Sequence, residues 1–332
     1  MQGANLTERI LRKRMHGLYL SRPCDELETL AHELLGLHSW FYRNVPFSAL
    51  IRGADIRGWQ TRLTKTWLYR GTLHGVVYED LPMLLALHAN GSSLARYLGE
   101  QALRDAAQEV LHYMEDGVYS RSEFRRIFAG RYDTDWLEAM FSPWGGIFVY
   151  LARLGKVAFR DMESRDFDLI SAEPTQTPDE VLPHLLRRYF AAYGPATLAD
   201  AAWFFGLGQE AKQLLPTLPL DGIDSFAHEG VRYYDVACGD TADIPALTLL
   251  SGFDPYIVSY KERSAILPAA YQKQVILSSG ICNPTIALHG RIAGIWNLSK
   301  GEPRITFFTA QPKRIQAEAA ARVDMIRRRM RP

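Results

Sequence analysis

The chain has 332 residues, 47% hydrophobic and 23% charged, an ordinary globular composition that excludes a largely disordered protein. At roughly 100–200 residues per domain, this length predicts two to four domains. The net charge of +1 excludes a uniformly basic nucleic-acid binder, so any contact with phosphates has to come from a local patch of Lys and Arg.

The three cysteines, Cys24, Cys238 and Cys282, lie far apart and form no C-x-x-C pair. This spacing argues against a metal site and a disulfide framework and favours a reduced, cytoplasmic compartment. Cys282 is either a nucleophile or a small buried hydrophobic residue, and we favour the second.

Other motifs with a known mechanism are absent from the sequence. It contains no phosphate-binding loop, dinucleotide fingerprint or H-E-x-x-H, so we expect no cofactor and no metal. It also has no secretory signal and no run of about 18 apolar residues, so we expect a soluble protein without a membrane span.

Helical spacing of apolar residues is found in the first part of the chain. It predicts helices at 5–20 and 25–35, the second ended by Gly36, and again at 47–51 and 78–87. The residues between the second and third helices, beginning at Leu37, leave the helical pattern. They are expected to form a loop.

The stretch T-W-L-Y-R-G-T-L-H at 66–74 alternates as a β-strand does. On that register Arg70, Thr72 and His74 lie in a row on one face. A buried strand keeps such groups only by hydrogen-bonding them, whereas a functional site uses them. The pattern alone leaves both interpretations open.

The central part alternates helices and short strands. A first helix is expected at 94–114, and a capping box beginning at Ser120 opens a second. A third helix at 137–154, interrupted around 143–146, is followed by a strand at 155–160. Helix, turn, helix, helix and hairpin in this order are typical of a winged helix.

The same order returns after a Pro- and Thr-rich linker at 172–177. Helices are predicted at 181–193, 197–205 and 209–215, and a hairpin turning at Gly230 follows. This pattern indicates a further winged helix.

Short strand-like runs separated by Gly, Pro and Asn turns fill the last part of the chain, at 247–250, 256–260, 285–288, 291–298 and 304–309. They predict a small β module. The final segment, 313–331, is helical in composition and very basic at its end. We favour a solvated helix end over a phosphate contact.

Three blocks of this sequence resemble those of a known family. They are T-W-L-Y-R-G-T-L-H followed by E-D-L, R-Y-F-A-A-Y-G-P-A-T-L-A-D-A-A-W-F-F-G-L at 188–207, and F-D-P-Y-I-V-S-Y-K-E-R-S at 253–264. In content and order they are similar to the signature blocks of the AlkZ/YcaQ-type winged-helix DNA glycosylases, and they span nearly the whole chain.

The resemblance implies an α+β fold, with tandem winged-helix (helix-turn-helix) domains followed by a small C-terminal β-barrel-like module, arranged as a C shape around duplex DNA. We place the first winged-helix domain at 1–92, a second, winged-helix-like domain at 93–172, a third at 177–243, and the β module with its basic helix at 244–332.

The resemblance also implies a monofunctional glycosylase that hydrolyses the N-glycosidic bond of alkylated purines, including crosslinked ones. A purine alkylated at N7 is already cationic and leaves readily. The enzyme therefore has to supply mainly a positioned water and a polar group near the oxocarbenium-like sugar. Family members do this with Gln-x-Gln or Gln-x-Asp in the loop after the amphipathic helix of the first domain.

This sequence departs from that motif. The matching stretch, G-L-H-S-W-F-Y-R-N, places His38 and Trp40 where the two catalytic side chains would be. Trp40 has no hydrogen-bond acceptor, whereas neutral His38 can orient or deprotonate a water. Either His38 has taken over the task or the site has lost it. Structural roles are the alternative: His38 is then a hydrogen-bonding residue of the fold and Trp40 a core residue. Trp40 could also be a surface on which a displaced base stacks.

Further candidate contacts with substrate or DNA are Arg70, Thr72, His74, Lys261 and Arg263. For the first three we favour bracing of the first domain. For the last two, together with Asp254, we favour local ion pairs over phosphate contacts.

Two functions follow as hypotheses: a monomeric repair glycosylase on duplex DNA with His38 as its catalytic residue, or a non-catalytic winged-helix DNA-binding protein that regulates or shields lesions. A protein-interaction scaffold is the least favoured, because it gives the three blocks no role.

Overall fold

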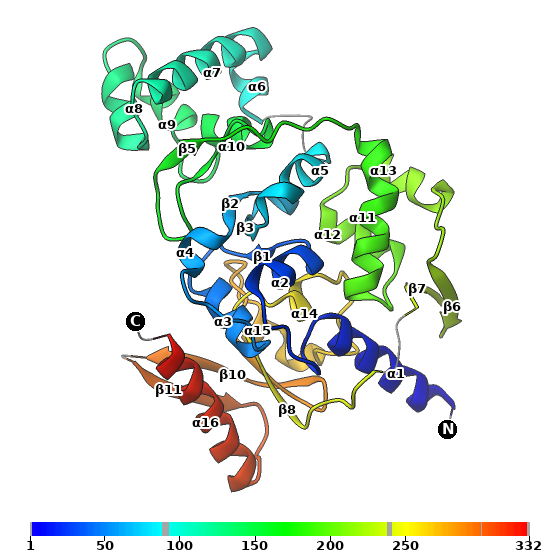
Figure 1. Cartoon of the computed structure of the whole chain (residues 1–332). Coiled ribbons are helices and arrows are strands. Elements are labelled where there is room, and N and C mark those ends of the chain that lie inside the picture. Colours follow the sequence, from blue (N-terminus) through cyan, green and yellow to red (C-terminus); the bar gives the residue numbers. More distant parts are fainter. Residues whose placement is uncertain (1, 88–92, 238–240, 300, 331–332) are drawn as a thin grey trace. The chain divides into compact units, whose positions relative to one another are not determined.

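The computed structural model describes residues 2–87, 93–237, 241–299 and 301–330 (Figure 1). The chain divides into two compact units. The first comprises residues 1–57 and 183–332, and the second comprises residues 58–182. Cys238 and Arg331 lie outside the described residues. The expected division into four domains stays a prediction.

The second unit combines helices with a small antiparallel sheet. Its elements are α4 (Trp59–Arg62), β2 (Thr64–Trp67), η1 (Tyr69–Gly71), β3 (Leu73–Val76), η2 (Tyr78–Asp80), α5 (Leu81–Ala86), α6 (Ser93–Leu98), α7 (Glu100–Glu115), α8 (Arg121–Phe128), α9 (Thr134–Met140), α10 (Ile147–Arg153), β4 (Val157–Phe159) and β5 (Phe167–Leu169). Its strands follow one another in the order β3-β2-β4-β5.

An aromatic core holds this unit together. Phe148 of α10 stacks on Phe167 of β5 with 4.1 Å between ring centroids, and Trp67 of β2 packs 4.8 Å from Phe159 of β4. The predicted capping box starts α8: Ser120 Oγ accepts the Glu123 N–H at 3.2 Å, and Glu123 accepts the Ser120 N–H at 3.0 Å. The helices predicted in this part are confirmed, although Gly99, with φ 84°, divides the first into α6 and α7.

The predicted single strand at 66–74 is wrong, because the stretch is a hairpin. Arg70 and Gly71 both have positive φ, at 54° and 69°, and turn the chain so that β2 and β3 pair antiparallel with Thr66 opposite His74. Left-handed conformations at two successive residues are the signature of a tight hairpin turn. The alternation of the sequence therefore continues across a turn, and the row of three polar side chains on one strand face does not exist.

A buried lysine in this sheet gives a testable pH dependence. Lys65 Nζ donates to the carbonyls of Met162 and Ser164, each at 3.0 Å, and lies 4.4 Å from the centroid of the Phe159 ring. Burial lowers the pKa of Lys65 from 10.5 to about 8.

Because the folded pKa lies below the unfolded one, the unfolded chain binds more protons between pH 8 and 10.5, and folding stability gained from Lys65 rises with pH across that window. We expect the stability of the wild type relative to Lys65→Gln to rise from pH 8 to 10.5, measured by urea unfolding of both proteins. A difference that does not change with pH would contradict this assignment.

The first unit contains the remaining elements. They are α1 (Gln2–Gly17), α2 (Leu27–Glu33), β1 (Leu37–His38), α3 (Asn44–Ile51), α11 (Pro178–Tyr193, which begins in the second unit), α12 (Leu198–Phe205), α13 (Gln209–Leu214), η3 (Leu215–Thr217), β6 (Asp224–His228), β7 (Val231–Asp235), β8 (Leu247–Leu250), α14 (Pro255–Val258), η4 (Ala269–Tyr271), α15 (Gln272–Val275), β9 (Thr285–Leu288), β10 (Arg291–Ser299), β11 (Glu302–Phe307) and α16 (Lys313–Arg329).

The helices and the hairpin predicted between 181 and 236 are confirmed as α11, α12, α13 and the pair β6–β7. A capping box starts α12, since Thr197 Oγ1 accepts the Asp200 N–H at 3.0 Å and Asp200 accepts the Thr197 N–H at 3.0 Å. Gly206, with φ 65°, ends the helix in the left-handed conformation that glycine adopts without strain.

The C-terminal sheet has the order β11-β10-β9-β8, with β11 and β8 at its edges (Figure 1). It is therefore open over the described residues, and the expected barrel-like closure is not found. Helix α16 covers it with Ala319, Val323 and Ile326, which join a core containing Trp296 of β10 and Leu50 of α3. A single helix packed on one face buries the apolar side of the sheet without closing it.

The strand expected at 256–260 is also wrong, because residues Pro255–Val258 form the short helix α14. Asp254 caps it by accepting the Tyr256 N–H at 3.0 Å, and Pro255 occupies the first helical position. Asp followed by Pro is a helix-start signal that competes with the β-branched run after it.

At the basic end of α16, Asp324 forms ion pairs with Arg327 at 2.5 Å and with Arg328 at 2.7 Å. The hydrogen bond from Arg327 lowers the pKa of Asp324. These local pairs agree with the solvated helix end that we favoured. No helix within the described ranges is long and apolar enough to cross a membrane.

Candidate catalytic loop and basic pocket

The loop that carries His38 leaves helix α2 through two left-handed residues. Leu35 and Gly36 have φ of 56° and 106°, and the Gly36 N–H donates to the Ala31 carbonyl at 2.7 Å. This geometry ends the helix and directs the chain into β1 (Leu37–His38). His38 is 7% exposed, and Trp40 is half-buried.

Phe253 and the Trp40 backbone both contact the ring of His38. The imidazole stacks on the ring of Phe253 with 4.2 Å between centroids and 4° between planes. The Trp40 backbone N–H donates to His38 Nδ1 at 3.4 Å. Phe41 lies on Phe253 in turn, with 6.1 Å between centroids. The two predicted site residues His38 and Trp40 are thus in direct contact.

Phe253 is held in a strained conformation by its surroundings. Its φ is 54°, a left-handed value that a bulky side chain rarely adopts. Its N–H donates to the Cys282 carbonyl at 3.2 Å. The preceding Gly252 allows close packing, because a Cβ there would lie 2.9 Å from Asn44 Oδ1.

The next residue, Asp254, forms a fully buried ion pair with Arg52. Arg52 Nη1 and Nη2 donate to Asp254 Oδ2 and Oδ1 at 3.0 and 2.8 Å, and both side chains are 0% exposed. Asp254 also accepts from the N–H and Oγ of Ser251 and from the Tyr256 N–H. Arg52 donates further to Ser48 and to the Leu18 carbonyl. The ion pair ties the F-D-P turn to Arg52 at the end of α3, and the bonds from Ser251 and Tyr256 hold the turn itself.

The local ion pairs that we expected for Asp254, Lys261 and Arg263 within the β module are not found among the described residues. Asp254 pairs with Arg52, the Lys261 N–H donates to Asp200 at 2.8 Å, and Arg263 Nε donates to the Ile257 carbonyl at 2.8 Å. Burial lowers the pKa of Arg263. Neither basic side chain forms an ion pair with any described residue.

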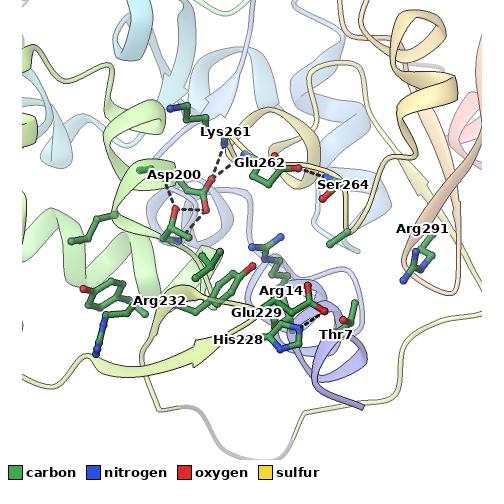
Figure 2. A pocket seen from close by; sticks show the side chains of 18 residues that line it. Thr7, Arg14, Asp200, His228, Glu229, Arg232, Lys261, Glu262, Ser264 and Arg291 are labelled. Atoms are coloured by element: carbon green, nitrogen blue, oxygen red, sulfur yellow. Dashed lines mark hydrogen bonds and ion pairs between the residues drawn. The ribbon is translucent and has the colours of Figure 1, made fainter. Parts of the chain in front are cut away.

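A pocket of about 750 Å³ lies between α1, the start of α12, the β6–β7 hairpin and the loop at 261–265 (Figure 2). Its basic residues are Arg14, Arg232, Lys261 and Arg291, and its acidic residues are Asp200, Glu229 and Glu262. The volume lies within the usual range for ligand sites in proteins.

Arg14 forms part of the pocket wall although it is only 3% exposed. Its guanidinium lies 4.0 Å from the centroid of the Tyr260 ring, and its Nε donates to the Pro195 carbonyl at 2.9 Å. These contacts hold a positive charge at a defined place beside the pocket.

Asp200 joins two of the three sequence blocks in this pocket. Besides capping α12, it accepts the N–H groups of Lys261 and Glu262 at 2.8 and 3.3 Å (Figure 2). Together with the N–H and the hydroxyl of Thr197, these make four donors to its carboxylate. Glu262 in turn accepts the Ser264 N–H at 2.7 Å, which lowers the pKa of Glu262. The carboxylates of Asp200 and Glu262 thus accept hydrogen bonds from the backbone of the loop. The basic side chains of Arg232, Lys261 and Arg291 also line the pocket, and we call them its basic rim.

The candidates of the second unit lie at its hairpin. Thr72 Oγ1 donates to the Tyr69 carbonyl at 3.0 Å, His74 Nδ1 lies 3.1 Å from the Thr72 carbonyl, and the His74 ring is edge-on to Tyr69. Arg70 occupies the turn itself. These contacts fit the bracing role that we favoured, and contact of the three residues with substrate stays a prediction.

The structure also bears on the cysteine and metal interpretations. Cys282 is 2% exposed, and burial raises the pKa of its thiol to about 12, which is typical of a buried small residue and not of a nucleophile. Across the residues that the structure describes, no three His, Cys, Asp or Glu side chains gather as metal ligands do.

Phe253, Arg52, Asn44 and Gly252 were not among the site residues predicted from the sequence. Only the block at 253–264 pointed to this region, and within it we assigned roles to Asp254, Lys261 and Arg263 but not to Phe253. A φ of +54° at a phenylalanine has no sequence signal, and the stacking of Phe253 on His38 joins residues far apart in the chain.

Comparisons with known proteins agree with the resemblance. A family model described as "DNA glycosylase AlkZ-like" matches residues 59–331. The "Interstrand DNA cross-link repair glycosylase" of Streptomyces sahachiroi is 24% identical over 278 residues, which cover 74% of this chain and 73% of that protein. The structure of Streptomyces sahachiroi DNA glycosylase AlkZ matches with a TM-score of 0.80 and 22% identity, covering 96% of each chain. The likeness confirms a mixed fold of this type, and the family match begins after His38 and Trp40.

Proposed function

Because the family model matches residues 59–331, the chain belongs to the AlkZ-like DNA glycosylase family, and from this we propose that it is a repair protein that binds duplex DNA and hydrolyses the N-glycosidic bond of alkylated purines. The proposed substrates include crosslinked bases, since a relative is named for interstrand crosslink repair, and N7-alkylpurines, which the family resemblance implies. The family match is the observation that carries the proposal.

We propose that winged helices supply the DNA-binding surface. The order α11, α12, α13 and then the β6–β7 hairpin is the order of elements in a winged helix, and it supports this assignment for residues 177–243. A monomer with several such units can contact duplex DNA without dimerising. The free thiols of Cys24 and Cys282 are compatible with a reduced cytoplasmic compartment.

In the proposed reaction the C1′–N9 bond breaks and its electron pair passes to the purine. Alkylation at N7 makes the purine a cation, so this step leaves a neutral base and needs no protonation. The oxygen of a water then bonds to C1′ and the water loses a proton to solvent. The protein has to position that water beside the sugar, and His38 is the residue that we assign to this task in place of the Gln implied by the resemblance.

A second candidate function is a non-catalytic DNA-binding protein. One observation favours it: His38 is only 7% exposed, and Trp40 offers no second hydrogen-bond acceptor beside it. The two functions share DNA binding and differ in base release, which is measured on a duplex containing N7-methylguanine.

Binding to undamaged duplex DNA is expected to weaken steeply with salt and to show little sequence preference, because phosphate contacts carry no sequence information. If the basic rim of the pocket contacts phosphates, Lys261→Ala and Arg291→Ala should each reduce the slope of log K against log salt by about 1.

The matched control is Lys273→Ala, an exposed cation of α15 outside the pocket, which should leave the slope unchanged. Equal slopes for the wild type and both rim variants, measured by fluorescence anisotropy from low to high salt, would remove the pocket from the DNA-binding surface. Failure of the wild type to bind duplex DNA at low salt would remove both candidate functions.

A further inference from the structure

We propose that Phe253 is a positioning residue for His38, and that Phe253 and the Trp40 N–H together hold His38 as the tautomer with its proton on Nε2. This inference deepens the proposed function and rests on it for its catalytic meaning. The structural part, which nitrogen carries the proton and what holds the ring, is measured independently of base release.

The tautomer follows from the donor at Nδ1. A backbone N–H only donates, so the contact of Trp40 N–H with His38 Nδ1 at 3.4 Å requires an unprotonated Nδ1. A neutral imidazole carries one proton, which is then on Nε2.

The two contacts fix different degrees of freedom of the ring. Flat stacking on Phe253, at 4.2 Å and 4°, fixes the plane of the imidazole. A half-turn of the ring within that plane would preserve the stacking but move Nδ1 away from the Trp40 N–H. Stacking therefore sets the plane and the N–H sets which edge of the ring faces the loop.

Phe253 is suited to this role because its own backbone is fixed. A left-handed φ in a bulky residue costs on the order of 1–3 kcal/mol and persists only where the surroundings impose it. Here the buried Arg52–Asp254 pair holds the following residue, and the Cys282 carbonyl holds the Phe253 N–H. The conformation places the ring against His38 and away from ordinary core packing, since Phe253 remains half-buried.

The chemical consequence concerns how His38 handles a water. With its proton on Nε2, His38 donates through that nitrogen and does not accept a proton there. A water that accepts from Nε2–H keeps a second lone pair for C1′, so the tautomer suits orientation of the water. The role of a general base through Nε2 needs the opposite tautomer, which would put two donors, Nδ1–H and Trp40 N–H, against each other.

The test is ¹⁵N nuclear magnetic resonance of the full chain labelled in its histidines, at a pH where imidazoles are neutral. The His38 signals are identified by their loss in His38→Gln. The wild type is expected to show a pyrrole-type Nε2 and a pyridine-type Nδ1. In Phe253→Leu, which removes the stacking surface, the two signals should move toward the average of both tautomers, and Phe253→Tyr should restore the wild-type pattern.

Phe47→Leu serves as the matched control, because Phe47 is also a half-buried aromatic of the first unit and packs on Trp296. It should leave the His38 signals unchanged. Unfolding midpoints of all variants report whether the fold is retained. A pyridine-type Nε2 in the wild type, or an unchanged pattern in a folded Phe253→Leu, would overturn the inference.

Base release adds the catalytic readout. Phe253→Leu should reduce the single-turnover rate on an N7-methylguanine duplex roughly tenfold to a hundredfold while the affinity for that duplex stays unchanged, because a misplaced ring affects the reaction step. If the wild type releases no base but its His38 signals match the expectation, the positioning of His38 is supported and the proposed function fails. If the wild type is active and Phe253→Leu keeps the same single-turnover rate of base release, the positioning role is overturned.

Discussion

His38→Ala is expected to reduce the release of N7-methylguanine from duplex DNA by roughly a hundredfold or more, the usual contribution of a positioned side chain that handles a proton or a water at the reacting centre. The variant should still bind undamaged duplex DNA, since phosphate contacts rather than His38 supply that affinity. The measurement is a single-turnover assay of released base, with binding measured on the same protein preparation.

His112→Ala is the matched control for this substitution. His112 lies on α7 in the second unit, with its side chain 71% exposed, so its loss should leave base release unchanged. His38→Gln returns the amide that the family resemblance implies at this position and should retain more activity than the alanine variant. Equal rates for His38→Ala and the wild type would show that the reaction does not depend on His38.

The second large effect is expected on stability, at the buried Arg52–Asp254 pair. Asp254→Ala leaves the Arg52 guanidinium, 0% exposed, without its carboxylate. Removing one partner of such a pair typically costs about 3–5 kcal/mol, because an uncompensated charge stays buried. The free energy of unfolding from urea denaturation is expected to fall by about this amount.

Two comparisons separate this effect from general loss of an ion pair. Glu100→Ala breaks the exposed pair with Arg104 on α7 and should cost less than about 1 kcal/mol. The double variant Arg52→Met with Asp254→Leu removes both buried charges and should be more stable than Asp254→Ala alone. A cost for Asp254→Ala as small as that of Glu100→Ala would contradict the assigned role of the pair.

Local signals in the sequence predicted much of the fold. The capping boxes at Ser120 and Thr197 and the hairpin turn at Gly230 were readable because each depends on residues a few positions apart. The errors arose where two local signals competed. At 66–74 the alternation of a strand concealed the Arg70–Gly71 turn, and at 256–260 a β-like run concealed the helix start at Asp254.

The candidate site was less accessible to sequence reasoning. The loop with His38 and Trp40 could be located only through the family resemblance. The residues that surround these two side chains could not be predicted at all. Phe253 stacks on His38 and Arg52 pairs with Asp254 across long stretches of chain, and a single sequence carries no signal for such pairings. The prediction of a barrel-like module was wrong for a related reason. Short strands can be predicted from the sequence, but whether their sheet closes depends on what packs on it, and here helix α16 does so.

The strongest test of the proposed function is release of N7-methylguanine from a defined duplex by the wild-type protein, in molar excess over DNA, compared with buffer alone and with His38→Ala. If the proposed function is correct, release is well above the spontaneous rate in buffer and is lost in the variant. Release by the wild type no faster than in buffer, across N7-alkylated and crosslinked duplexes that the protein demonstrably binds, would contradict it and favour the non-catalytic DNA-binding function.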